Sequence, residues 1–195
     1  METISIKKVD SAALEQKVKK MYSDVALNPS GEYHFEMGRS LAEKLGYNQN
    51  DLDRIPADAI ESFAGVGYYF DMADLKEGDL VLDLGSGSGM DSFIAALLVG
   101  EPGRVTGVDM TDQQLEKAER LRKERQIDNV SFCKSYIESL PFPDGSFDLV
   151  ETDFLLQFLV SSDRRAVLHE WARVLRAGGG LMTRDWVTHE RGLDP

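Results

Sequence analysis

From Leu75 onward the chain alternates short apolar runs with amphipathic segments, and this order constrains the fold more than any other feature of the sequence. Five runs have the character of strands, and they read LVLDL, RVTGVD, VSFC, FDLVE and LMTRDW. Strands that alternate with helices become parallel neighbours, because only a crossover connection returns the chain to the same edge. The sequence therefore predicts an α/β fold with a doubly wound, mainly parallel sheet.

Three helices are expected between these strands. Residues 90–99 carry an apolar stripe and are followed by Gly100, a typical helix end. Thr111 and Gln114 have the spacing of a capping box, which predicts the start of a second helix. A third helix is expected from Ser162 to the glycines at 178–180, and its buried stripe comprises Val167, Leu168, Trp171 and Leu175.

The first 74 residues follow a different pattern, which is helical and irregular. Apolar spacing predicts helices near residues 9–25, 40–45 and 56–63. We therefore divide the chain into an N-terminal helical cap segment, residues 1–74, and a ligand-binding α/β domain, residues 75–195.

Composition limits the classes of function. The net charge of −12 disfavours a nucleic-acid partner, which would require a basic surface. A single cysteine, Cys133, excludes an internal disulfide and a metal site of several thiolates, and the three histidines lack the spacing of metal ligands. Because no segment has the length and apolarity of a signal core or a membrane span, we expect a cytoplasmic protein with no membrane partner.

The turn after the first predicted strand contains Gly85, Ser86, Gly87 and Gly89. Its glycines follow the spacing G-x-G-x-G, whereas the fingerprint of dinucleotide-binding folds is G-x-G-x-x-G. Asp83, at the end of the strand, would repel a phosphate but could bind an ammonium group. The turn therefore favours a ligand without phosphate that carries positive charge.

Asp109 ends the second predicted strand, and an acid there can accept hydrogen bonds from both hydroxyls of a ribose. Ligands of parallel sheets lie beyond the carboxyl ends of the strands, so Asp83, the glycine turn and Asp109 are expected to share one site. Together they match S-adenosylmethionine, which has an ammonium, a sulfonium, a ribose and an adenine. A nicotinamide-dependent oxidoreductase is the less favoured alternative, because the third glycine is misplaced.

The chain also resembles the class I S-adenosylmethionine-dependent methyltransferases, from Leu75 to Trp186. VLDLGSGSG is similar to their first motif, VTGVDMT to their second strand with its acid, and SYIESLPFPDGSFDLV to the stretch with the adenine contacts and the fourth strand. RVLRAGGGL is similar to the turn before their fifth strand. The resemblance implies a Rossmann-like fold, S-adenosylmethionine as cofactor, and an adenine site formed by Met110, Ile137 and Glu138.

Within that family the chain is most similar to the arsenite methyltransferases and their bacterial relatives, through MYSDVA, ESFAGVG, GVDMTDQQLEKA and YIESLPF. Arsenite methylation in those proteins depends on cysteine thiolates that bind trivalent arsenic. By the resemblance, Val66 occupies one of these cysteine positions in the present chain, and Asp153 lies approximately at another. With Cys133 as its one thiol, the chain is not expected to methylate arsenite, and another small-molecule acceptor is predicted.

The resemblance has two further implications. The family normally has seven strands, and this chain stops soon after the fifth, so the last strands are expected to be missing, with a second copy of the chain as one possible cover for the sheet edge. The N-terminal segment of the family folds over the cofactor, which makes Tyr22 and His34 candidates for the acceptor site. Asp153 is the candidate for orienting or deprotonating the acceptor. A binding module that retains cofactor affinity without turnover remains the alternative function.

Overall fold

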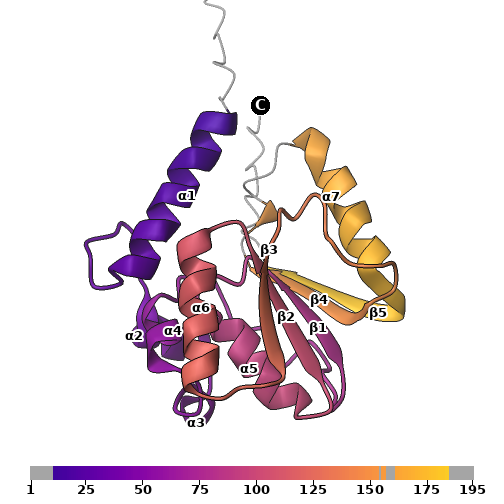
Figure 1. The fold of residues 1–195 in the computed structure, drawn as a ribbon, viewed down its shortest axis with the longest axis horizontal. Helices are drawn as coiled ribbons and strands as arrows, with labels where there is room; N and C mark the ends of the chain where they lie inside the picture. The colour runs from indigo at the N-terminus through magenta and orange to yellow at the C-terminus, as the bar shows by residue number, and fades with distance from the viewer. Residues whose placement is uncertain (1–10, 154, 157–160, 185–195) are drawn as a thin grey trace, which may run out of the picture.

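The computed structural model describes residues 11–153, 155, 156 and 161–184, and its centre is a five-stranded sheet (Figure 1). The strand order is β3-β2-β1-β4-β5, and each pair of neighbours is parallel. The order reverses direction at β1, where β2 and β4 lie on either side. The fold is therefore the predicted α/β, Rossmann-like, doubly wound sheet, whose strands are β1 (Leu80–Leu84), β2 (Arg104–Asp109), β3 (Val130–Lys134), β4 (Phe147–Asp153) and β5 (Leu175–Arg184).

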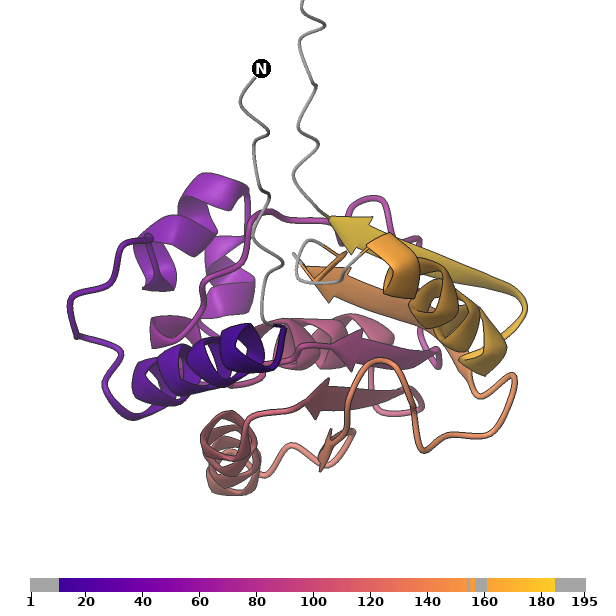
Figure 2. The same cartoon turned by 90° about the horizontal axis from the view of Figure 1, so that it is seen from above.

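Helices cover both faces of the sheet, as Figures 1 and 2 show. One face packs against α5 and α6, together with the N-terminal helices, and the opposite face packs against α7. The helices are α1 (Ser11–Leu27), α2 (Gly38–Leu45), α3 (Gln49–Leu52), α4 (Ala57–Glu61), α5 (Met90–Val99), α6 (Asp112–Glu124) and α7 (Ser161–Val174). The short helix α3 was not expected from the sequence, which offers too few residues there for a recognisable period.

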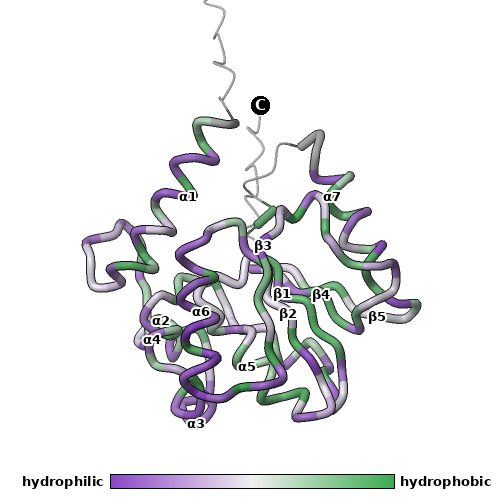
Figure 3. The backbone as a smooth tube through the Cα atoms, viewed as in Figure 1, coloured by the Kyte–Doolittle hydropathy of each residue, from purple (hydrophilic) through white to green (hydrophobic). Residues whose placement is uncertain are grey.

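The central strands are apolar because both of their faces are covered. Val81 and Leu149 point into the core beneath α5, whereas Leu82 and Val150 point into the core beneath α7. All four are at most 3% exposed, and the strands form a hydrophobic centre in Figure 3. The N-terminal helices contribute Ala42, Leu52 and Ile60 to the first of these cores, so they share it with the sheet.

Two predictions about α7 were wrong, namely the residue at which the helix ends and the burial of Leu168. The helix ends at Val174, and the glycines at 178–180 lie within the span of β5. Phe147 of β4 pairs with Leu175, and Leu149 pairs with Gly180, so the intervening residues of β5 bulge out of the ladder. Leu168 is 37% exposed, while Val167 and Trp171 are fully buried, because the apolar stripe is narrower than its sequence period indicated.

Candidate active site

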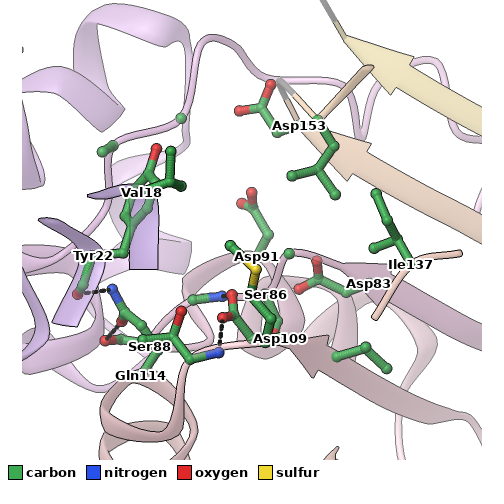
Figure 4. A pocket seen from close by; sticks show the side chains of 18 of the residues that line it. Val18, Tyr22, Asp83, Ser86, Ser88, Asp91, Asp109, Gln114, Ile137 and Asp153 are labelled. Carbon is green, nitrogen blue, oxygen red and sulfur yellow. Dashed lines mark hydrogen bonds between the residues drawn. The ribbon is translucent and has the colours of Figure 1, made fainter. Parts of the chain in front are cut away.

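A cavity of about 430 Å³ opens at the carboxyl ends of β1, β2 and β4. This is the place where the strand order reverses, and where ligands of such sheets bind. Helix α1 contributes Leu14, Val18 and Tyr22 to the opposite wall, so the apolar side of this helix covers the cavity (Figure 4). That placement explains why Leu14 is 41% exposed in a helix whose sequence predicted a buried stripe.

The glycine turn forms the floor of the cavity next to β2. Gly85 and Ser86 donate their N–H groups to the Val108 carbonyl oxygen, at 2.7 and 3.0 Å. Gly85, Ser86 and Gly87 line the cavity, and both glycines have a positive φ, of 81° and 52°. This backbone conformation is costly for residues with a Cβ, which explains the requirement for glycine.

Gly89 has a different place, because it precedes the first residue of α5 and does not line the cavity. Its φ is 90°, and a Cβ at this position would lie 2.7 Å from Cζ of Phe132. The third glycine therefore lets α5 begin close against β3, a packing role that the sequence did not separate from a binding role.

Asp109 lies at the end of β2 and lines the cavity, as do Met110, Ile137 and Glu138. Its Oδ2 accepts the N–H of Gly87 at 3.0 Å, and its Oδ1 accepts the N–H of Thr111 at 2.7 Å (Figure 4). These bonds hold the carboxylate toward the glycine turn and leave each oxygen with capacity for a further hydrogen bond. Burial raises the pKa of Asp109 even though both N–H groups favour its charged form.

Gln114 links three parts of the site, a role that the sequence did not reveal. The expected capping box is not formed, because the Thr111 side chain makes no capping hydrogen bond. Instead Gln114 Oε1 accepts the Ser88 hydroxyl at 2.5 Å, and its Nε2 donates to the Tyr22 carbonyl oxygen at 2.9 Å. Gln114 thus joins the glycine turn to α1, and Ser23 adds a bond to Gln113 at 2.9 Å.

The three candidates for acceptor chemistry have different positions. Tyr22 and Asp153 line the cavity, and the Val66 N–H donates to Asp153 Oδ2 at 2.7 Å. The structure thus places the Val66 backbone in direct contact with the Asp153 side chain. His34 does not line the cavity; its side chain is exposed and its ring packs edge-on against Phe35.

Three further acids are grouped beneath the cavity, on the α5 side of the sheet. Asp83 of β1 and Glu151 of β4 are neighbours in the ladder, and both line the cavity although they are only 3% and 1% exposed. Asp83 accepts the Ser92 hydroxyl at 2.5 Å, and Asp91 accepts the Tyr47 hydroxyl at 2.6 Å. Asp83 and Asp91 lie around the same space in Figure 4.

Burial and mutual repulsion raise the pKa values of these three acids. Burial raises the pKa of Asp83 to about 7, and nearby Asp109 and Asp153 act in the same direction. Burial likewise raises the pKa values of Asp91 and Glu151 well above their ordinary values, with the charge of Asp83 as the next cause. The sequence analysis missed Asp91 and Glu151, because an acid in the first turn of a helix is common and a single acid in a strand carries no motif.

Within the described part of the chain, no three histidine, cysteine or acidic side chains are arranged to hold a metal ion. None of the described helices is both long and apolar enough to cross a membrane.

Comparisons with known proteins agree with this geometry. A family model described as a methyltransferase domain matches residues 75–193. The arsenite methyltransferase of Halobacterium salinarum is 35% identical over 167 residues, which cover 84% of this chain and 42% of the relative. The ubiquinone/menaquinone biosynthesis C-methyltransferase of an Enterobacter strain is 32% identical over 120 residues, covering 61% of this chain and 47% of the relative.

A solved structure shows the same relationship. The crystal structure of an arsenic(III) S-adenosylmethionine methyltransferase from Chlamydomonas reinhardtii superposes with a TM-score of 0.62 and 39% identity, covering 70% of this chain and 48% of that one. The present chain spans less than half the length of each of these three proteins. The match extends through the glycine turn, both strand-end acids and the loop with Ile137 and Glu138, and the chain therefore belongs to the class I S-adenosylmethionine-dependent methyltransferases, as a relative of the arsenite methyltransferases.

Proposed function

We propose that this chain transfers a methyl group from S-adenosylmethionine to a small-molecule acceptor other than arsenite. The observation that carries the proposal is that Asp83 and Asp109, from adjacent strands, line one cavity on either side of the glycine turn. Asp109 would accept the ribose hydroxyls, while Ile137 and Met110 would enclose the adenine. Asp83 would face the positively charged methionine end.

The residues present fit this cofactor. Gly85 and Gly87 leave room for a ligand to approach the backbone, and Ser86 Oγ is a buried polar atom without a partner in the described structure. When bound, the cofactor supplies a methyl group on a positively charged sulfur. The chain's own contribution is to hold the acceptor in line with that methyl group and to exclude water, and α1 with Val18 and Tyr22 covers the cavity for this purpose.

Calorimetric titration tests the cofactor assignment directly. We expect S-adenosylmethionine and S-adenosylhomocysteine to bind and a nicotinamide dinucleotide not to bind. Tight binding of the dinucleotide alone would support the oxidoreductase alternative. Formation of S-adenosylhomocysteine with a library of acceptors then separates an enzyme from a module that only binds the cofactor.

Replacing Asp109 with alanine is expected to weaken S-adenosylmethionine binding by about 1–3 kcal/mol, since a charged hydrogen-bond acceptor is lost. Calorimetry at constant pH measures the effect. Asp112→Ala is the matched control, because this nearby acid is exposed and pairs with Lys134 outside the cavity. Equal affinities of wild type and Asp109→Ala would remove Asp109 from the site.

The exclusion of arsenite rests on the residues next to the acceptor side. Val66 and Asp153, which replace two cysteines by the family resemblance, are joined by a hydrogen bond of 2.7 Å. An amide and a carboxylate offer no soft ligand to trivalent arsenic. We expect arsenite to produce no S-adenosylhomocysteine above background, and turnover at a rate comparable with other acceptors would contradict this part of the proposal.

A further inference from the structure

The charge of the cavity lining is one-sided. Among the described residues that line it, seven are acidic and none is basic, the acids being Glu15, Asp83, Asp91, Asp109, Glu138, Glu151 and Asp153. Three basic residues lie close by without lining the cavity: Lys19 pairs with Glu15 at 2.7 Å, Lys117 donates to Ser62 at 2.8 Å, and Arg184, the ladder partner of Asp153, interacts electrostatically with Asp91. Such a lining attracts cations and opposes the entry of carboxylates and phosphates.

The acids divide into two groups. Asp109 and Glu138 lie at the end of the cavity that the proposed function assigns to the adenosyl group, and Glu15 is exposed on α1. The remaining four, Asp83, Asp91, Glu151 and Asp153, lie on the α5 side beyond β1 and β4. Four carboxyl groups are more than are needed to balance the single net positive charge of S-adenosylmethionine.

Glu151 differs from the other three in its hydrogen bonding. Asp83, Asp91 and Asp153 each accept a hydrogen bond from a serine, a tyrosine or a backbone N–H. Glu151 Oε1 is buried and has no hydrogen-bond partner in the described structure, although the Tyr69 hydroxyl lies near the carboxyl group and lowers its pKa. Because buried polar atoms in proteins are nearly always paired, this oxygen in the cavity wall indicates a ligand that donates hydrogen bonds.

Glu151 and Asp153 lie on the same face of β4, because side chains of a strand alternate between its two faces. Their Cα atoms are two residues apart along the strand, a spacing of roughly 7 Å. One nitrogen atom can lie between two carboxylates at this separation and donate to both. Asp153 is next to Gly65, at the side of the cavity away from Asp109 (Figure 4).

We propose that the methyl acceptor is an amine, whose nitrogen binds between the carboxylates of Glu151 and Asp153. The inference rests on the methyltransferase function proposed above and names its class of substrate. Carboxylate and phosphate acceptors are excluded by the charge of the lining. Neutral alcohols and carbon acceptors could enter but would leave these carboxylates less well paired.

The chemistry balances with these residues alone and the methyl sulfonium donor. A basic amine enters as its ammonium ion, whose positive charge favours the ionised form of Glu151, and it passes one proton to that carboxylate, which burial then holds. The neutral nitrogen attacks the methyl carbon, a nitrogen–carbon bond forms, and the carbon–sulfur bond breaks with its electron pair on sulfur. The methylated ammonium product leaves with neutral S-adenosylhomocysteine, and the proton on Glu151 returns to water.

The first test uses a binding probe and does not need the natural acceptor. Sinefungin is an S-adenosylmethionine analogue in which a carbon with an amino group replaces the methylated sulfur, so its amine lies at the reacting position. We expect the wild type to bind sinefungin at least tenfold more tightly than S-adenosylhomocysteine. Glu151→Gln is expected to lose at least fivefold of this preference, with its affinity for S-adenosylhomocysteine changed less than twofold.

Asp148→Asn is the matched control, because Asp148 is a buried acid of the same strand that faces away from the cavity. Its preference for sinefungin should equal that of the wild type. Equal binding of the two analogues by the wild type, or equal weakening of both by Glu151→Gln, overturns the inference and leaves the cofactor assignment intact. Failure of all three adenosyl compounds to bind contradicts the proposed function itself.

A second test compares matched acceptors, namely phenethylamine, 2-phenylethanol and phenylacetate, by release of S-adenosylhomocysteine. We expect the amine to be turned over faster than the alcohol and the carboxylate to be inactive. A higher kcat/KM for the alcohol or the carboxylate than for the amine would overturn the inference.

Discussion

Raising the pH from 5 to 7.5 is expected to lower the free energy of unfolding of the ligand-free protein by about 2–3 kcal/mol through Asp83 alone. The physical reason is that Asp83 is 3% exposed and lies among other acids, so its folded-state pKa is raised to about 7. The unfolded chain has an ordinary carboxyl with a pKa of about 4. Asp91 and Glu151 act in the same direction.

The sign follows from the number of bound protons. Between pH 4 and 7 the folded protein keeps a proton that the unfolded chain has released, so stability falls as the pH rises through this range. Glu170 is the opposite case: hydrogen bonds from Arg173 and from the Leu140 N–H lower its pKa to about 2. Its stabilising effect is therefore complete at pH 5 and does not change over the window.

Urea unfolding followed by circular dichroism at several pH values measures this slope. Asp83→Asn should make this slope smaller, because the amide can still accept the Ser92 hydroxyl bond but does not titrate. Glu101→Gln, an exposed control, should leave the slope unchanged. A wild-type stability that is constant or rises between pH 5 and 7.5 would contradict the prediction.

Replacing Trp171 with alanine is expected to destabilise the protein by about 3–5 kcal/mol. Trp171 is 0% exposed, and it is among the largest fully buried side chains in the described chain. It packs with Leu82, Val108 and Val150 beneath the strands, so its loss leaves a cavity at the centre of this core. Its Nε1 also donates to the Ile137 carbonyl oxygen at 3.1 Å, which anchors a loop that lines the cavity.

Two companion variants separate packing from hydrogen bonding. Trp171→Phe keeps most of the apolar volume and is expected to cost about 1–3 kcal/mol, mainly by leaving the Ile137 carbonyl without its partner. Leu168→Ala, on the same helix but 37% exposed, is expected to cost about 1 kcal/mol or less. Urea unfolding at one pH measures the free energy of unfolding of all three variants. If Trp171→Ala lowers it by no more than Leu168→Ala does, the buried role of Trp171 is contradicted.

The central strands β1, β2 and β4 could be predicted from local pattern because most of their residues are buried on both faces. LVLDL and RVTGVD coincide with β1 and β2, because a short, continuous apolar run between turn residues is typical of a buried strand. The end of α7 was not predictable, because glycines usually terminate helices and here they form a bulge in β5. Whether Leu168 or Val174 faces the core likewise depends on how α7 lies against β5.

The sequence by itself determined the order of elements, the glycine turn and the acids at the two strand ends, because these depend on short-range spacing that is visible in the chain. Only the tertiary structure decided which side chains meet. Glu151, Asp91 and Gln114 come from three separate elements and become one site when the sheet, α5 and α6 pack together. Their chemistry arises from shared burial and mutual charge repulsion, which depend on distances through space and have no period or motif along the chain.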